Sequence, residues 1–309
     1  MTRVAAVDCG TNSIRLLVAD LSGAGAISDV HREMRIVRLG QGVDRTGELD
    51  AAALERTRLA LVDYAATCRE LDVEAVRLVA TSATRDARNR DVFTAMVEGT
   101  LGTSPEVVSG DEEAALSFVG ATGGLAESDG PFLVMDIGGG STEVVLGTTA
   151  VVAARSVDVG CVRLTERHLH DDPPTAAQVA AAQQDVETAL ELVRAVVPVE
   201  HARTAVGLAG SVTTVAALAL GLLTYDATRI HGARLPADDI RAVTQRLLTM
   251  THARRAELPV VHPGRVDVIA AGALVLRTIV DRFDLPEVLV SEADILDGIA
   301  LSLHPGGTT

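Results

Sequence analysis

Two segments of the sequence combine an aspartate, small turn residues and hydroxyl side chains in the same order. Residues 7–18 align without gaps on residues 135–146, at an offset of 128 positions. Each copy reads as a strand with an aspartate near its end, a turn, and a serine before a second strand. Backbone N–H groups in such turns can approach a phosphate closely, and hydroxyl groups add donors. The turn residues are Gly10, Thr11, Asn12 and Ser13 in the first copy, and Gly138, Gly139, Gly140 and Ser141 in the second.

Taken alone, the three successive glycines favour a flexible hairpin turn. The repeat favours an anion held between two hairpins that donate hydrogen bonds from opposite sides. Arg15 adds a positive charge beside the first turn, and Thr142 adds a second hydroxyl beside the other.

Asp8 and Asp136 occupy equivalent positions in the two copies. A carboxylate beside a phosphate is repulsive unless a cation lies between them, so the pair indicates Mg²⁺ or Mn²⁺. The alternative is a turn-capping role for each aspartate at its strand end.

Three acidic residues crowd the start of a helix expected to begin near Asp111. Ser109 and Glu112 have the spacing of a capping box, and an acid in the first turn suits the helix dipole. Glu113 is left over, about 100° further round the helix than Glu112. A carboxylate there could orient and deprotonate a water that attacks phosphorus.

Three further candidates lie near junctions of strands and helices. Gly210 and Ser211 belong to a turn that could hold a phosphate or a nucleoside, or could simply cap a helix. Arg85 follows a strand end, where clefts open in α/β folds, and Arg265 is a further candidate for phosphate binding.

Predicted strands and helices alternate along the chain, which favours an α/β fold. These elements must position the candidate residues. The repeat suggests two related domains that face each other across a cleft, residues 1–125 and 126–309. Residues 204–225 are uncharged over a length that could span a membrane, but they read better as strand, turn and buried helix. The expected strands are residues 3–9, 13–20, 76–81, 107–109, 205–208 and 288–290, and the expected helices are residues 51–71, 175–197, 211–223, 238–250, 265–283 and 294–303.

The net charge is −15, and every basic residue is an arginine. Without lysine, Schiff-base chemistry and a Walker-type phosphate lysine are excluded. An acidic protein repels nucleic acids and anionic membranes, so we expect neither as a partner and expect local groups to hold any anionic substrate. The three cysteines form no disulfide or zinc pattern, which favours the reducing cytoplasm.

Together these segments resemble the exopolyphosphatase and guanosine pentaphosphate phosphatase (Ppx/GppA) family, within the superfold of acetate and sugar kinases, heat-shock chaperones and actin. The resemblance spans almost the whole chain. The strings that carry it are residues 8–15, 80–89, 109–114 and 136–143, with weaker matches at residues 159–166 and 265–272.

The resemblance implies two actin-like, ribonuclease H-like domains with mixed sheets flanked by helices and an interdomain active-site cleft. It also implies hydrolysis of the terminal phosphate of polyphosphate or of guanosine pentaphosphate with Mg²⁺, and a homodimer. The family's catalytic glutamate falls on Glu113 and its metal-associated aspartate on Asp136. Asp8 is the second expected metal ligand. We add Glu143, which lies in the same string as Asp136.

Two departures from the family shape the remaining expectations. Long members carry a further C-terminal helical domain, and residues 1–309 match only the two core domains, so we expect a preference for short polyphosphates. Residues 294–305 are expected to form a helix that packs back onto the first domain. Leu296 and Asp297 stand where relatives commonly have Arg and Glu, which weakens the case for an anion contact there.

Two rival functions remain open. A small-molecule kinase on the same superfold would need an acceptor hydroxyl, and the Glu112–Glu113 pair favours a hydrolase instead. A non-enzymatic sensor of polyphosphate or of guanosine tetra- and pentaphosphate would bind without turnover.

Overall fold

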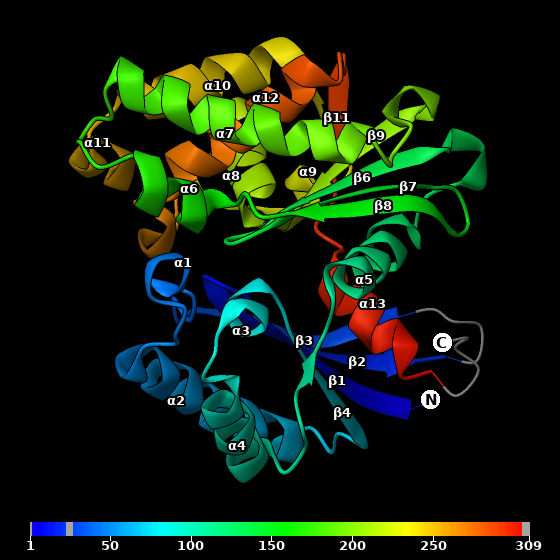
Figure 1. Cartoon of the computed structure of the whole chain (residues 1–309). Helices are drawn as coiled ribbons and strands as arrows, with labels where there is room; N and C mark the ends of the chain where they lie inside the picture. The colour runs from blue at the N-terminus through cyan, green and yellow to red at the C-terminus, as the bar shows by residue number, and fades with distance from the viewer. Residues whose placement is uncertain (1, 23–26, 305–309) are drawn as a thin grey trace. The chain divides into compact units, whose positions relative to one another are not determined.

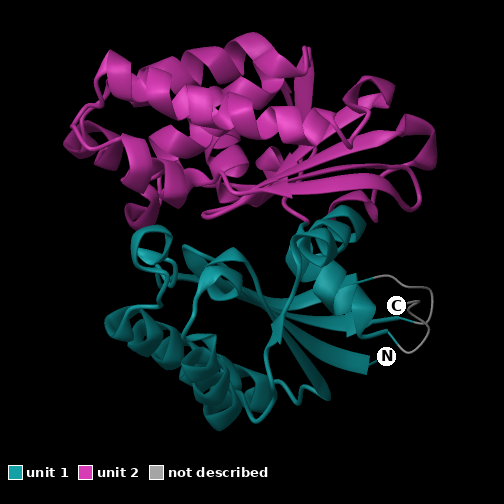
Figure 2. Ribbon diagram, in the orientation of Figure 1, with its two compact units in different colours: residues 1–120, 294–309 teal, residues 121–293 magenta. Residues whose placement is uncertain are grey.

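The computed structural model describes residues 2–22 and 27–304. Its internal contacts divide the chain into two compact units (Figure 2). The first comprises residues 1–120 and 294–309, and the second comprises residues 121–293. The last segment of the chain therefore belongs to the same unit as the first. Residue 305, the end of the expected C-terminal helix, lies outside the described residues.

The first unit is built on a five-stranded mixed sheet in the order β3-β2-β1-β4-β5. The β1–β2 and β2–β3 pairs are antiparallel, whereas β4 pairs in parallel with both β1 and β5. The strands are β1 (Thr2–Cys9), β2 (Ser13–Leu21), β3 (Ile27–Ile36), β4 (Ala75–Ala80) and β5 (Glu106–Val107).

Both faces of this sheet are covered, so its central strands are continuously apolar. In β1, Ala5 and Val7 face a core that includes Leu61, Tyr64 and Phe93 from helices α2 (Ala51–Glu70) and α4 (Arg90–Leu101). Val4 and Ala6 face the opposite core, which helix α13 (Ile295–Ser302) covers (Figure 1). The other helices of the unit are α1 (Val43–Thr46), α3 (Ser82–Asp86) and α5 (Gly110–Thr122).

The second unit contains a six-stranded sheet in the order β10-β11-β9-β6-β7-β8. The β6–β7 and β7–β8 pairs are antiparallel, and β6 pairs in parallel with β9. Strands β8-β7-β6-β9-β11 repeat the order and directions of the first sheet, and β10 adds an antiparallel strand at the edge. The predicted fold class of two actin-like α/β domains is confirmed. The strands are β6 (Phe132–Ile137), β7 (Thr142–Gly147), β8 (Val151–Val157), β9 (Thr204–Leu208), β10 (Arg234–Pro236) and β11 (Glu287–Val290).

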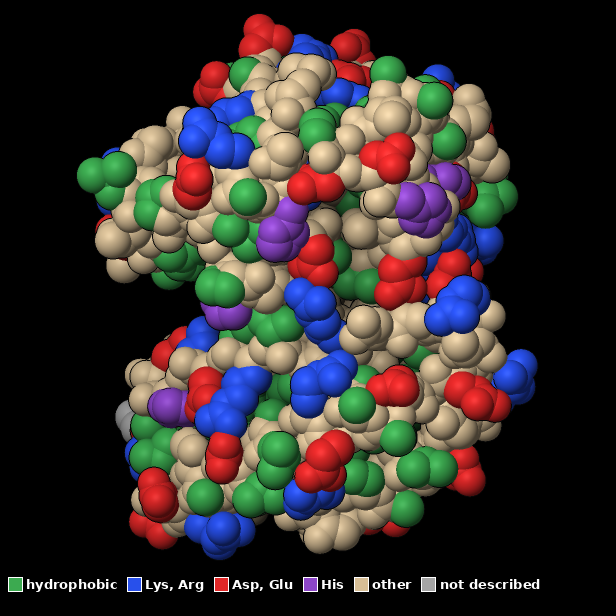
Figure 3. All heavy atoms as spheres, turned by 90° about the vertical axis from the view of Figure 1, so that its left-hand side faces the viewer, with side chains coloured by type: hydrophobic (Ala, Val, Ile, Leu, Met, Phe, Trp, Pro, Cys, Tyr) green, Lys and Arg blue, Asp and Glu red, His purple; other side chains and the backbone are tan. Residues whose placement is uncertain are grey.

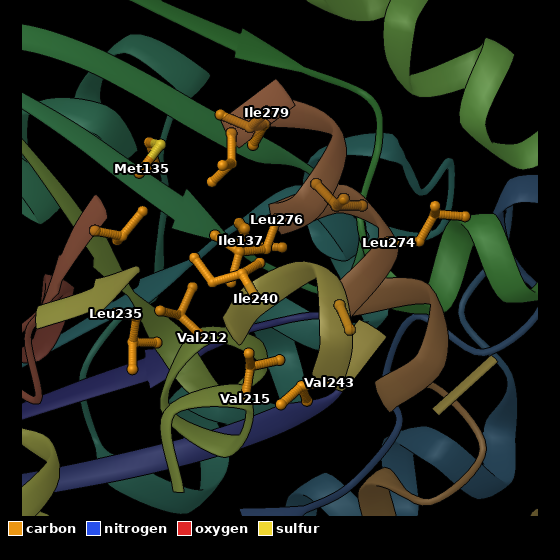
Figure 4. Packing of buried hydrophobic residues seen from close by; sticks show 14 of the residues in the cluster. Met135, Ile137, Val212, Val215, Leu235, Ile240, Val243, Leu274, Leu276 and Ile279 are labelled. Atoms are coloured by element: carbon orange, nitrogen blue, oxygen red, sulfur yellow. The ribbon is translucent and has the colours of Figure 1, made fainter. Parts of the chain in front are cut away.

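An aliphatic core holds the second unit together (Figure 4). Met135 and Ile137 of β6 pack with Val212, Leu274 and other buried residues. The helices are α6 (Cys161–His168), α7 (Ala176–Arg194), α8 (Ala209–Ala219), α9 (Ala227–Ile230), α10 (Ala237–Thr249), α11 (His252–Ala256) and α12 (Ile269–Arg282), with 3₁₀ turns at Glu127–Asp129, Val199–His201 and Pro263–Arg265.

The predicted strands and helices are found, but several of their ends are displaced. The predicted strand 107–109 is observed at Glu106–Val107, and the predicted helix 211–223 ends at Ala219. Arg265 was expected to open a long helix, yet it ends the turn Pro263–Arg265, and α12 begins only at Ile269. No range was predicted for strands β3, β8 and β10 or for helices α1, α3, α4, α6, α9 and α11. No helix in the described part of the chain is long and apolar enough to cross a membrane. On the face drawn in Figure 3, acidic and basic side chains are interspersed.

Candidate active site

The first hairpin turn, between β1 and β2, uses its carbonyl groups within the fold. The carbonyl of Thr11 accepts from Gly40 N at 2.8 Å, and that of Asn12 accepts from Val37 N at 3.1 Å and Arg38 N at 2.9 Å. Within residues 2–22 and 27–304, the amides of Thr11 and Asn12 have no hydrogen-bond acceptor. The turn therefore offers donors, and its acceptors are already engaged.

The second turn, between β6 and β7, likewise has engaged carbonyl groups, but its hydrogen-bond donors come from α6. The carbonyls of Gly138 and Gly139 accept from the first amides of α6, Cys161 N at 3.0 Å and Val162 N at 2.9 Å. The Gly140 carbonyl accepts from Arg163 Nε at 2.7 Å. In the described chain the amides of Gly139, Gly140 and Ser141 have no acceptor. Each turn, with central N–H groups that lack an acceptor, suits an anion.

Three of the predicted phosphate donors serve the fold instead. Gly10 N donates to the Ser13 carbonyl, and Gly138 N donates to the Ser141 carbonyl, both at 3.0 Å. The Thr142 side chain is fully buried, and its hydroxyl donates to the Val159 carbonyl at 2.7 Å. These bonds fix the shape of the turns, so the donors still available for an anion are the central amides and the Asn12, Ser13 and Ser141 side chains.

Arg15 lies between two carboxylates of the first unit. It is the cross-strand partner of Asp8, and its Nε and Nη2 donate to Asp8 Oδ2 at 3.0 and 2.7 Å. Its Nη1 donates to Asp294, the residue that caps α13. Burial raises the pKa of Asp8, and the Arg15 charge and hydrogen bonds oppose that shift. Arg15 thus holds Asp8 in place, and its contact with phosphate stays a prediction.

Asp8 and Asp136 present the donor type that a hard cation prefers. Asp8 is 5% exposed, and both bonds from Arg15 go to Oδ2, so Oδ1 keeps its lone pairs. Asp136 is 7% exposed and lies opposite Glu143 on the neighbouring strand. Glu143 Oε1 accepts from the Ser156 hydroxyl at 2.7 Å. No described group of three or more His, Cys, Asp or Glu residues is placed to hold a metal. Mg²⁺ needs only one or two protein carboxylates when water and phosphate oxygens complete its coordination, so each aspartate is a candidate ligand.

Glu113 is separated from its acidic neighbours as the sequence predicts. The capping box is confirmed, because Glu112 Oε2 accepts from Ser109 N at 2.8 Å and Glu112 N donates to Ser109 Oγ at 3.2 Å. Those hydrogen bonds lower the pKa of Glu112. Glu113 is only 8% exposed, and its Oε2 accepts from Arg85 Nη1 at 3.0 Å. A buried carboxylate oriented by a guanidinium can act on a water molecule.

Gly210 and Arg265 are brought into contact in the second unit. A Cβ atom at position 210 would lie 1.1 Å from Arg265 Nη1, so the guanidinium rests directly on the glycine. Ser211 lies close to Gly272, where an added Cβ would be 2.3 Å from Ser211 Oγ. Ala209 begins α8 with a φ of 67°, a left-handed conformation that costs energy outside glycine. The structure therefore gathers three of the predicted residues around one turn.

Two contributors were missed by sequence reasoning. Arg163 supports the second turn from α6, and Asp294 supports Arg15 from the start of α13. The only signal for either was a charged residue in a segment that resembles the family.

Comparison with known proteins gives the wider context of this geometry. A sequence model described as the Ppx/GppA phosphatase family matches residues 17–305. Exopolyphosphatase 2 of Mycobacterium tuberculosis is 54% identical over 315 residues, covering 98% of this chain and 99% of that protein. The chain belongs to the Ppx/GppA phosphatase family.

Other similarities agree with membership of the Ppx/GppA family. A crystal structure described as an exopolyphosphatase-like protein has a TM-score of 0.94 at 43% identity, and the match covers 97% of this chain and 98% of that one. The guanosine-5'-triphosphate,3'-diphosphate pyrophosphatase of Pseudoalteromonas translucida is 26% identical over 97% of this chain, which spans 59% of that protein.

Proposed function

We propose that this chain is an exopolyphosphatase that removes the terminal phosphate of inorganic polyphosphate. The observation that carries the proposal is the pair of equivalent turns whose central amides lack an acceptor among the described residues while their carbonyls are engaged. The identity to a protein named Exopolyphosphatase 2 supports the choice of substrate. We assign the amides of each turn, with the Asn12, Ser13 and Ser141 side chains, to the binding of polyphosphate oxygens.

Glu113 is the proposed general base. Its carboxylate accepts a proton from a water molecule as the water oxygen bonds to the terminal phosphorus. The bridging P–O bond breaks, orthophosphate leaves, and a shortened polyphosphate remains. Arg85 orients Glu113 through the 3.0 Å hydrogen bond. In this mechanism the rate is raised mainly by positioning the reacting groups and by stabilising charge.

Asp8 and Asp136 are the proposed ligands of Mg²⁺ or Mn²⁺, with Glu143 beside Asp136 on the same face of the sheet. The bound ion would neutralise charge on the phosphate oxygens. Asp8 Oδ1 is the oxygen that Arg15 leaves for it.

Short polyphosphates are the proposed preferred substrates. The net charge of −15 and the absence of lysine favour a substrate gripped at its end by local donors over one that lies along an extended surface. We further propose that the protein acts as a cytoplasmic homodimer. The three free, buried cysteines fit a reducing compartment.

The second candidate substrate is the 5′ phosphate of guanosine pentaphosphate, a nucleotide of the stringent response. The similarity to the Pseudoalteromonas translucida protein favours it. Contact between Gly210 and Arg265 provides a place where a nucleoside phosphate could be recognised.

One experiment tests the proposal and separates its rivals. Orthophosphate release is measured side by side from short polyphosphate, long polyphosphate, guanosine pentaphosphate and ATP at saturating Mg²⁺. We expect the highest kcat/KM with short polyphosphate. Release only from the nucleotide would favour the second candidate, and tight binding with no release from any substrate would favour a sensor. Light scattering of the same protein tests the dimer.

A further inference from the structure

A line of charged side chains connects the first hairpin to the start of α13. Arg15 contacts Asp8 on one side and Asp294 on the other. Asp294 N donates to Asp297 Oδ2 at 2.9 Å, and Asp297 Oδ1 accepts from Arg32 Nη2 at 2.8 Å. Asp8, Asp294 and Asp297 are each less than a tenth exposed. These charges are therefore screened little by water, and each depends on its neighbour.

The start of α13 also contacts the helix that carries Glu113. A Cβ atom at Gly120 of α5 would lie 1.7 Å from the Asp294 carbonyl oxygen, and one at Gly298 would lie 2.0 Å from the Leu116 carbonyl oxygen. The two helices therefore touch backbone to backbone, as Figure 1 shows for α5 and α13. Asp294 stands where this contact and the line of charges meet.

We propose that Asp294 is a positioning residue for the reaction and acts on Asp8 through Arg15. The inference rests on the proposed function, in which Asp8 binds the cation. Asp294 accepts from Nη1 of Arg15, and Nε and Nη2 of the same guanidinium both donate to Oδ2 of Asp8. Asp8 Oδ1 is thereby kept for the cation.

Loss of the Asp294 charge would change how Arg15 pairs with Asp8 and how negative the site is. Of these two carboxylates, Asp8 alone would then pair with Arg15. The net charge of Asp8, Arg15 and residue 294 together would rise from −1 to 0. A cation would meet a less negative site, and Asp8 would be held more tightly by Arg15. Both effects weaken cation binding.

The Asp294→Asn variant separates this role from the capping of α13. Asp294 Oδ1 accepts from Leu296 N at 3.0 Å, and Oδ2 receives Arg15. Asparagine caps helices as well as aspartate does, but it would present an N–H group to the guanidinium. Asp294→Ala removes both interactions.

Asp20→Asn is the matched control. Asp20 faces Arg3 across the same two strands at their other end, with Arg3 Nε to Asp20 Oδ1 at 2.8 Å. The control therefore removes one carboxylate from an arginine pair of the same hairpin, away from Asp8.

Three measurements are made on the full chain: binding of Mn²⁺ alone by electron paramagnetic resonance, thermal unfolding, and phosphate release from short polyphosphate as a function of Mg²⁺. We expect Asp294→Asn to weaken Mn²⁺ binding about 10-fold and to raise the half-activating Mg²⁺ concentration similarly. Its melting temperature should stay close to that of the unaltered protein, whereas Asp294→Ala should melt lower. Asp20→Asn should bind Mn²⁺ within about 2-fold of the unaltered protein.

Unchanged Mn²⁺ binding in Asp294→Asn would overturn the inference, as would an equal loss in Asp20→Asn. Absence of Mn²⁺ binding in the unaltered protein would also overturn it. Failure of the proposed function gives a different result, since Mn²⁺ binding would respond to Asp294→Asn while no phosphate is released by any form.

Discussion

Arg85 Nη1 donates to Glu113 Oε2 and to the Val108 carbonyl, each at 3.0 Å. The guanidinium of Arg85, in α3, thus bonds both to Glu113 of α5 and to the backbone just before that helix. The carboxylate that we propose as base is fixed relative to the backbone on which its own helix begins. Its orientation is therefore determined by the first unit before any substrate binds.

Glu113→Gln should lower kcat for phosphate release by about 10²–10⁴-fold, because the amide cannot accept a proton. Binding of polyphosphate, measured by isothermal titration calorimetry, should change little. Glu112→Gln is the control, since Gln also completes a capping box and the side chain lies at the helix start. Equal turnover of the Glu113 variant and the unaltered protein would refute the assignment of the base.

Arg85→Lys should lower kcat more than it raises KM. Lysine keeps the charge but cannot hold the carboxylate and the Val108 carbonyl with the planar geometry of a guanidinium. Arg85→Ala should in addition destabilise the fold by about 3 kcal/mol, because it leaves the buried Glu113 without this partner. Urea unfolding and steady-state kinetics measure the two effects. A rise in KM alone would instead assign Arg85 to substrate binding.

Asp136→Asn should require a much higher Mg²⁺ concentration for half-maximal activity, since a neutral amide is a weaker ligand for a hard cation than a carboxylate. The activity at saturating Mg²⁺ should recover in part. Ser156→Ala offers a comparison, because it removes the hydroxyl that donates to Glu143 and leaves both carboxylates in place. Identical Mg²⁺ dependence of the Asp136 variant and the unaltered protein would remove its proposed role.

Gly210→Ala should raise KM, because its methyl group would occupy the position of the Arg265 guanidinium. Arg265 has a long side chain and can move aside, so we expect the unfolding free energy to fall by no more than about 2 kcal/mol. Gly99→Ala, in α4, is the control, since its added Cβ meets nothing within 4 Å. That control should be neutral or stabilising by about 0.5–1 kcal/mol. An unaltered KM for Gly210→Ala would exclude Arg265 from substrate binding.

The capping box at Ser109 should make part of the stability depend on pH. The hydrogen bonds from Ser109 lower the pKa of Glu112 in the folded state. The stabilisation is therefore present above the unfolded pKa of 4.5 and is lost as pH falls through the lower pKa of the folded state. Ser109→Ala should cost about 1 kcal/mol at pH 7. The difference between the variant and the unaltered protein should shrink in denaturant titrations carried out at pH 3. A difference that is constant with pH would contradict this account.

Much of the site could be predicted from the sequence because its parts are local. Both hairpins, their turn residues and the separation of Glu113 from the capping residue Glu112 depend on neighbours only a few positions away. The long-range partners were not accessible in this way. Arg15 and Asp294 are 279 positions apart, and nothing in either local pattern points to the other.

Other differences have equally specific causes. Thr142 has the residue type of a phosphate donor, but its hydroxyl is 2.7 Å from a carbonyl 17 positions further along the chain. Strand β3 lies at the edge of its sheet and carries several charged residues, so it lacks the continuous apolar run that marked its neighbours. Helix α6 is short, and its first amides bond to the glycine turn, a contact that only the tertiary fold creates.

Because α13 completes the first unit, the order of synthesis constrains how the protein acquires its activity. Residues 121–293 are made between the two segments of that unit, so the first unit cannot close until Asp294 and α13 have been synthesised and released. Until then, Arg15 has no Asp294 to contact, and α5 lacks the surface on which Gly120 packs. A chain without α13 would thus contain Asp8 and Glu113 yet lack the contacts of Arg15 with Asp294 and of α5 with α13. The first unit therefore acquires the arrangement proposed for hydrolysis only by joining segments that are far apart in the sequence.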